Sequence, residues 1–217
     1  MVTPSTCASG SIRTATAHTG LPWRIHEIAP DFQLEDVWAL PTPGGPDDFG
    51  RLMSRFTVAD PDAPALMSST IGRFLMALRW KLGALLGWDR DKTGLGARVH
   101  TLRDRLPADL LDGPRGPELE GVPFQSVFLT DNEWAAEIAN STVHAVLHLG
   151  WVADTTVEGG YRGQMAVLVK PNGRLGTAYM ALIKPFRYLW VYPDLLRTIA
   201  RGWDAGFGNA AWVNRAR

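Results

Sequence analysis

Hydrophobic and polar residues alternate with a period of two through residues 140–151, near the middle of the chain. The odd positions carry mainly apolar side chains: Ser141, Val143, Ala145, Leu147, Leu149 and Trp151. The even positions carry mainly polar side chains: Asn140, Thr142, His144, Val146 and His148. Because successive side chains point to opposite faces of a strand, we predict one long strand here, continuous with residues 133–140, that has an apolar face and a polar face.

The same kind of pattern predicts strands and helices elsewhere in the chain. Residues 32–40 alternate like a strand, and the acidic residues after Pro46 favour a helix start within 46–56. Apolar residues spaced three and four apart predict a longer helix over 65–86. Residues 124–129 and 161–170 are further predicted strands.

A strong turn signal follows residues 161–170. Pro171-Asn172-Gly173 is typical of a β-hairpin, because Asn-Gly accepts positive φ angles. We therefore predict a returning strand over 176–184 and a further strand over 186–191. Pro193 suits the first turn of a final helix, where its missing N–H has no cost. The predicted order is strand, two helices, several antiparallel strands and a long C-terminal helix, which indicates an α+β fold with a curved sheet around the last helix. A cleft between such a sheet and helix commonly binds an apolar ligand.

The composition limits the class of protein. The 217 residues include 22 Lys+Arg and 22 Asp+Glu, so the formal charge is zero and the basic excess typical of nucleic-acid binders is missing. Charged residues or glycines interrupt every apolar stretch well before the roughly 20 residues that span a bilayer. We therefore expect no nucleic-acid partner and no membrane span, and the default compartment is the cytoplasm.

The two ends of the chain differ in composition from the middle. Residues 1–22 are rich in Ser, Thr, Ala and Gly and lack the pattern of a secretory signal, which predicts a flexible N-terminal tail. One domain is expected over 23–207, followed by a C-terminal tail over 208–217. The single cysteine, Cys7, lies in the predicted tail, and one cysteine makes neither an intrachain disulfide nor a zinc cluster.

Several short motifs resemble a bacterial family in combination: Arg79-Trp80-x-Leu82-Gly83, Leu86-Gly87-Trp88, Arg105-Leu106-Pro107, Glu137-x-x-Asn140-x-Thr142-Val143-His144, His148-x-Gly150-Trp151, Tyr179-Met180 and Ile183-Lys184-Pro185-Phe186-Arg187. That family is catalogued as domain of unknown function 2867. The resemblance implies a branch of the START-like (SRPBCC) helix-grip superfamily, whose members enclose an apolar cavity. Family members occur alone or fused behind a nucleotide-binding reductase-like domain. The resemblance implies no reaction.

The two histidines of the predicted strand are the first candidates for chemistry. At about 3.3 Å per residue, His144 and His148 lie about 13 Å apart on one face, too far to share a metal ion, so we expect no metal site. His144 is the candidate general acid or base, with Asn140 and Glu137 as catalytic partners and with Thr142 and His148 as ligand contacts. Two alternatives stay open: the polar face lines the cleft, or it faces solvent.

A second set of candidates lies outside this strand. Lys184 is a candidate base, although a lysine at the end of a strand more often points to solvent. Arg187 is a candidate ligand for an anionic group, with a structural ion pair to Glu137 or another carboxylate as the alternative. A broad apolar lining is expected from Trp134, Trp151, Met165, Tyr179 and Met180. For these five residues, ordinary core packing is the alternative.

Three functions fit the sequence. The first is a cofactor-independent cyclase, isomerase or lyase that transfers protons to a hydrophobic substrate of polyketide, terpenoid or lipid type. The second is a non-catalytic carrier or sensor of such a molecule. The third is an accessory interaction domain for a reductase-like partner, which predicts an exposed apolar patch on the outer sheet or on residues 71–85. A homodimer is compatible with each, and no cofactor is expected, since no Gly-rich dinucleotide fingerprint opens a strand–helix unit.

Overall fold

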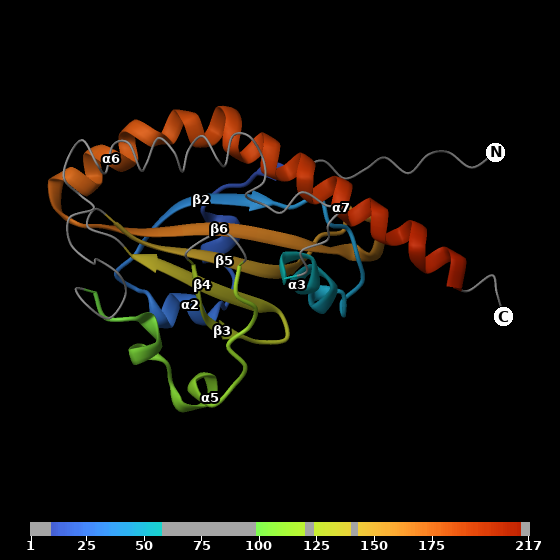
Figure 1. Cartoon of the computed structure of the whole chain (residues 1–217), viewed down its shortest axis with the longest axis horizontal. Helices are drawn as coiled ribbons and strands as arrows, with labels where there is room; N and C mark the ends of the chain where they lie inside the picture. Colours follow the sequence, from blue (N-terminus) through green and yellow to red (C-terminus); the bar gives the residue numbers. More distant parts are fainter. Residues whose placement is uncertain (1–9, 58–98, 120–123, 140–142, 214–217) are drawn as a thin grey trace.

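A six-stranded antiparallel sheet forms the centre of the protein, and a long C-terminal helix crosses one of its faces (Figure 1). The computed structural model describes residues 10–57, 99–119, 124–139 and 143–213. The strand order is β1-β2-β6-β5-β4-β3. The strands are β1 (Ser11–Ile12), β2 (Gln33–Ala39), β3 (Gln125–Leu129), β4 (Glu133–Ala139), β5 (Val143–Ala153) and β6 (Tyr161–Pro171). The architecture is α+β with a curved, open antiparallel sheet, consistent with a helix-grip-like fold, as the sequence predicted.

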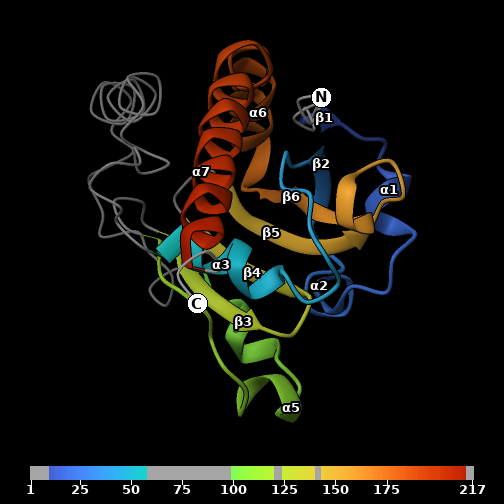
Figure 2. The same cartoon turned by 90° about the vertical axis from the view of Figure 1, so that its right-hand side faces the viewer.

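Helical segments lie on both faces of this sheet (Figure 2). Before and between the strands they are α1 (Thr16–Thr19), α2 (Arg24–Ile28), α3 (Phe49–Thr57), η1 (Leu102–Arg105), α5 (Ala108–Leu111) and η2 (Glu158–Gly160). After the last strand the chain continues as α6 (Gly173–Phe186), the π-helical turn η3 (Arg187–Val191) and α7 (Tyr192–Val213). The predicted helix over 65–86 lies outside the described residues.

The face of the sheet that carries α3 and α7 is called the inner face here. Leu149 and Trp151 of β5 and Met165 of β6 point to this face. They pack against Tyr192, Leu196 and Trp203 of α7 and against Phe49, Leu52 and Met53 of α3. The apolar odd positions of β5 therefore build the core beneath the C-terminal helix, because burying a large apolar side chain contributes about 1.5–3 kcal/mol.

The opposite face, called the outer face, is covered as well. Ile25 and Ile28 of α2, Leu102 of η1 and Leu110 of α5 pack against strand residues of this face, which include Val127, Val146, Ala166 and Leu168. The cover lies so close at Gly150 that a β-carbon there would meet the Trp23 ring at 2.7 Å. In the described region, the outer face of the sheet therefore carries a second core. It is not the exposed apolar patch that we expected for an interaction domain.

The prediction of strands over 176–184 and 186–191 was wrong. Gly173 has the positive φ of 67° that the Asn-Gly signal indicated, but the chain then enters the helix α6 and the turn η3. Topology explains the difference, since β6 already pairs with β2 on one edge and with β5 on the other. No edge of β6 is free for a returning strand.

Two further boundaries differ from the prediction. The long strand expected over 133–151 is two antiparallel strands, β4 and β5, in which Ala139 pairs with His144. Residues 10–22, expected to belong to a flexible tail, are part of the folded body. Ser11 and Ile12 pair with β2, and the ring of His18 is fully buried. The predicted strands at 32–40, 124–129 and 161–170 and the helix within 46–56 are confirmed as β2, β3, β6 and α3.

Candidate functional site

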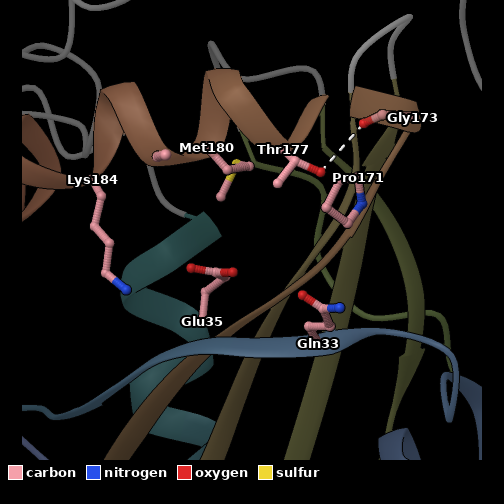
Figure 3. A pocket seen from close by; sticks show the side chains of 8 residues that line it. Gln33, Glu35, Pro171, Gly173, Thr177, Met180 and Lys184 are labelled. Carbon is pink, nitrogen blue, oxygen red and sulfur yellow. Dashed lines mark hydrogen bonds between the residues drawn. The ribbon is translucent and has the colours of Figure 1, made fainter. Parts of the chain in front are cut away.

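A cavity of about 590 Å³ opens between α6 and the sheet (Figure 3). Its lining residues come from β2, from the end of β6 and from one face of α6: Gln33, Glu35, Pro171, Gly173, Thr177, Met180, Ala181 and Lys184. Met180 is 8% exposed and packs with Val143 and Val169, so it forms an apolar floor. Gln33 and Lys184 are exposed and Glu35 is partly buried, so the polar groups lie toward solvent.

A β-bulge in β2 determines which side chains of that strand reach the inner face. Leu34 pairs with Leu168 and Asp36 pairs with Val167, so Glu35 is the extra residue between two pairs. A bulge interrupts the strict alternation of side chains. Glu35 lines the cavity and Asp36 contacts the C-terminal helix, so two consecutive carboxylates serve the same side of the sheet.

Asp36 holds the C-terminal helix to β2 at the turn η3. Its carboxylate is 3% exposed and accepts hydrogen bonds from Arg187 Nη2, Tyr188 Oη and Tyr192 Oη, the last at 2.6 Å. Arg187 also donates to Tyr192 Oη from Nη2 at 2.7 Å. Burial raises the pKa of Tyr192, so this hydroxyl stays protonated and donates to Asp36. Both carboxylate oxygens of Asp36 therefore accept hydrogen bonds within this cluster.

The two charged residues that line the cavity, Glu35 and Lys184, differ from the Asp36 cluster in their pairing. Lys184 lies one helical turn before Arg187, and Glu35 directly precedes Asp36. Figure 3 shows the two side chains extending from opposite walls toward the same space. In the described part of the chain, the structure assigns neither Glu35 nor Lys184 a hydrogen-bond or ion-pair partner, so both are available to a bound molecule.

Three of the residues predicted from sequence meet at this place. Lys184 and Met180 line the cavity, and Arg187 binds Asp36 beside it. Lys184 is exposed, on a helix rather than at the end of a strand. For Arg187, the structural ion pair is the interaction formed, with Asp36 as the carboxylate.

His144 and Glu137 lie on the outer face, away from this cavity. Glu137 Oε2 and His144 Nε2 are 2.7 Å apart, and both side chains are almost fully buried. The Glu137 carboxylate also accepts hydrogen bonds from the Thr101 hydroxyl and from the Leu102 backbone N–H. Glu137 stands on β4, diagonal to His144 across the strand pair, and not on the strand of the histidine as the sequence suggested.

His148 repeats the arrangement four residues further along β5. Its Nε2 lies 2.9 Å from Glu133 Oε2, and its Nδ1 lies 3.1 Å from Nε2 of His18. The ring of His26 stands edge-on to His18, with centroids 4.8 Å apart. Burial, with smaller effects from His148 and His26, lowers the pKa of His18 from 6.5 to about 3. Burial also lowers the pKa of His148.

The polar face of β5 therefore takes neither of the two positions considered from sequence. It neither lines a cleft under the C-terminal helix nor faces the solvent, because α1, α2 and η1 cover it. A buried carboxylate opposite each histidine makes this burial tolerable, since buried polar groups are costly only when they are unpaired.

The remaining predicted residues divide into two groups. Trp134, Trp151 and Met165 are buried in the inner core, where Trp134 Nε1 donates to Ser126 Oγ at 3.1 Å and Trp151 Nε1 donates to the Gly45 carbonyl at 2.9 Å. None of the three lines the cavity. Asn140 and Thr142, together with the side chain of Tyr179, lie outside the described part of the structure.

Sequence reasoning missed Gln33, Glu35 and Asp36. A signal was present, because Gln33-Leu34-Glu35-Asp36-Val37-Trp38 breaks its alternation at the adjacent acids. A strand of period two has room for only one of two neighbours on each face, so adjacent acids in an otherwise alternating strand indicate a bulge.

Neither a metal-binding cluster nor a membrane-crossing helix is found among the described residues. Within these ranges, no group of three or more His, Cys, Asp and Glu side chains is placed to hold a metal ion. None of the helices in the described part combines the length and the apolar character that a membrane crossing needs.

Comparison with known proteins places the chain in a family. The family model described as "Protein of unknown function (DUF2867)" matches residues 28–194. Neither the curated proteins nor the solved structures contain a match, so the relation to the START-like superfamily stays a prediction. The matched range covers most of the chain and includes both the bulge of β2 and the turn η3. The protein therefore belongs to the DUF2867 family, as its motifs indicated.

Proposed function

We propose that this protein binds a small organic molecule in the cavity between α6 and β2. The observation that carries the proposal is the cavity itself, which combines an apolar floor at Met180 with polar groups nearer to solvent. Its volume of about 590 Å³ lies within the range of about 300–1,000 Å³ that is usual for small-molecule sites. The bound molecule then has an apolar body that covers Met180 and Ala181 and a polar end near Glu35 and Lys184.

The position of the cavity supports binding as well. It lies between a helix and a sheet that the Asp36 cluster joins at one end, so its walls are set by the fold. Walls that are already in place before binding reduce the ordering cost of the complex.

Proton-transfer catalysis is a second candidate, and the free carboxylate of Glu35 is the observation that favours it. A carboxylate in a cavity, without a partner among the described residues, is placed to take a proton from a bound substrate. Lys184, on the opposite wall, is a source of a proton. His144 and Glu137 do not serve this role in our proposal, because they are bound to each other on the outer face.

Blocking the cavity tests the binding proposal. Ala181 is exposed and lines the cavity, so Ala181→Trp fills the space without replacing a core residue. The matched control is Leu189→Trp, which places the same side chain on the same long helix at a residue that is 68% exposed and outside the lining. Native mass spectrometry of the purified protein, mixed with a small-molecule extract, measures the bound mass.

We expect the wild type and Leu189→Trp to retain the same ligand mass and Ala181→Trp to lose it. Capture of that mass by all three proteins would place the ligand elsewhere and overturn the proposal, as would the absence of any bound mass in the wild type. If a ligand is captured, Glu35→Gln then separates carriage from catalysis. A catalyst loses conversion of that ligand while still binding it, whereas a carrier shows no conversion in either form.

A further inference from the structure

We propose that the ligand of this cavity is a zwitterion with an apolar remainder, that is, an amino-acid-like molecule that bears one ammonium and one carboxylate group. This inference rests on the proposed function and names the class of ligand for the same site. Glu35 binds the cationic group and Lys184 binds the anionic group.

The β2 bulge carries two acids, and they differ in their partners. Glu35 and Asp36 are adjacent in sequence and serve the same side of the sheet, yet only Asp36 is neutralised. Asp36 receives the guanidinium of Arg187 and two tyrosine hydroxyls. One negative charge is thus left over at the cavity wall, on Glu35.

The helical segment after β6 carries two cations, and these differ in the same way. Lys184 and Arg187 are three residues apart, so they lie on neighbouring positions of one helical face. Arg187 is committed to Asp36 and to Tyr192 Oη. One positive charge is left over on the same wall as Met180, on Lys184.

The carboxylate of Glu35 and the ammonium group of Lys184 face each other without pairing. No ion pair joins Glu35 and Lys184, although both line one cavity and extend toward the same space (Figure 3). A molecule that carries a single charge satisfies one of these groups and repels the other. A molecule with both charges satisfies each of them, which gives selectivity by attraction and by repulsion.

The rest of the lining fits the remainder of such a molecule. The amide of Gln33 neighbours Glu35 on β2 and has donors and an acceptor for the polar end. Thr177 donates its hydroxyl proton to the Gly173 carbonyl at 3.3 Å, so its oxygen lone pairs remain as acceptors for an ammonium group. Met180 and Ala181 offer apolar surface, and methionine adapts to side chains of different shape.

Isothermal titration calorimetry with three related probes tests the inference. The probes are phenylalanine, its amide, which lacks the carboxylate, and 3-phenylpropanoic acid, which lacks the ammonium. Longer ω-amino acids extend the series, because they vary the separation of the two charges. We expect the best zwitterion of this set to bind about tenfold more tightly than either singly charged analogue at low salt, and this preference to shrink as salt screens the charges.

Two variants assign each charge to its partner. Glu35→Gln should remove the advantage of the zwitterion over the acid and keep its advantage over the amide. Lys184→Gln should do the reverse. Glu158→Gln and Arg197→Gln are the controls, since both residues are exposed and outside the lining, and they should change neither ratio.

The inference fails if a singly charged probe binds as tightly as every zwitterion, or if both variants weaken all probes equally. A ligand that is captured by the wild type, lost in Ala181→Trp and singly charged or neutral would leave the proposed function standing and overturn this inference alone. Absence of any capture would overturn both.

Discussion

Titratable side chains on the two faces of the sheet differ in burial and in pairing. On the outer face, each histidine of β5 is buried and bound to its own glutamate, His144 to Glu137 and His148 to Glu133. On the inner face, Glu35 and Lys184 border a cavity and have no partner among the described residues. Conspicuous histidines therefore mark a packed layer here, whereas the groups open to a ligand are an ordinary glutamate and an ordinary lysine.

This difference in pairing depends on how many partners lie opposite the titratable groups, and not on the type of residue. On β4, glutamates four residues apart stand diagonally opposite histidines four residues apart on β5, so the register satisfies both pairs at once. On β2, the bulge provides two carboxylates while the helix turns one guanidinium and two tyrosines toward only one of them. Where the number of carboxylates equals the number of partners opposite them, as between β4 and β5, no charged group of these pairs is left free. Where there are more carboxylates than partners, as at the β2 bulge, one charged group remains for a ligand.

We expect the largest change in stability when a residue of the outer face loses its buried partner. Glu137→Ala removes the acceptor for the Thr101 hydroxyl, for the Leu102 N–H and for His144. We expect a loss of about 3 kcal/mol in the free energy of unfolding, measured by urea denaturation, because buried groups are left unpaired. Glu158→Ala, at an exposed position, is the control and should change the free energy by less than about 0.5 kcal/mol. A loss of under about 1 kcal/mol in Glu137→Ala would mean that water replaces the partner and that the outer layer is not dry.

The second effect is a dependence of stability on pH. His18 has a pKa of about 3 in the folded protein and about 6.5 in the unfolded chain, so the unfolded state binds the additional proton. Its contribution is fully present above pH 6.5 and is lost as the pH falls toward 3. The loss is about 1.4 kcal/mol per pH unit within that window.

Urea denaturation at pH 7.5 and at pH 5.0 measures this dependence. His18→Gln should reduce the difference in unfolding free energy between the two values by about 2 kcal/mol. His100→Gln is the control, because the His100 side chain is 94% exposed and should leave the difference unchanged. An equal pH dependence in His18→Gln and wild type would show that His18 is solvated rather than buried against His148.

The smallest effect belongs to the cavity. Glu35→Gln and Lys184→Gln should each change the free energy of unfolding by less than about 0.5 kcal/mol, because neither charge has a partner to lose. Thermal and urea unfolding of both variants measure this directly. Destabilisation of more than about 1 kcal/mol by either variant would show that its charge is part of the scaffold, and the contrast between the two faces would disappear.

Much of the sheet could be predicted from the sequence, because local alternation and a turn signal suffice for a strand. The alternating runs at 32–40, 124–129 and 161–170 became β2, β3 and β6. The segment after Gly173 could not be assigned in this way, since the choice between strand and helix depends on whether β6 has a free edge. That is a property of the assembled sheet, which no local pattern contains.

The site was harder to predict than the fold. Lys184, Met180 and Arg187 were selected from motifs and lie at or beside the cavity. His144 was selected because it stands on a polar strand face, but the burial of that face depends on helices that come from distant parts of the chain. The equal spacing of Glu133 and Glu137 with His144 and His148 was the sequence signal for pairing across strands.

The π-helical turn η3 determines which residues of the long C-terminal helix face the sheet. Met180 of α6 and Tyr192 of α7 both turn a buried side chain toward the sheet. At about 100° per residue, an uninterrupted α-helix would leave these two residues about 120° apart around the axis. A π-helical turn takes in one more residue than an α-helical turn, which shifts the phase by about 100° and brings both residues to the same side.

The turn η3 is thus a spacer that corrects the phase between two helical stripes. Leu189, which is 68% exposed, lies within it and contributes no core contact to the sheet. Its deletion would nevertheless rotate Tyr192, Leu196 and Trp203 away from the inner core, although every core side chain would still be present. The chain length between Lys184 and Tyr192 matters to this fold independently of which residues occupy it.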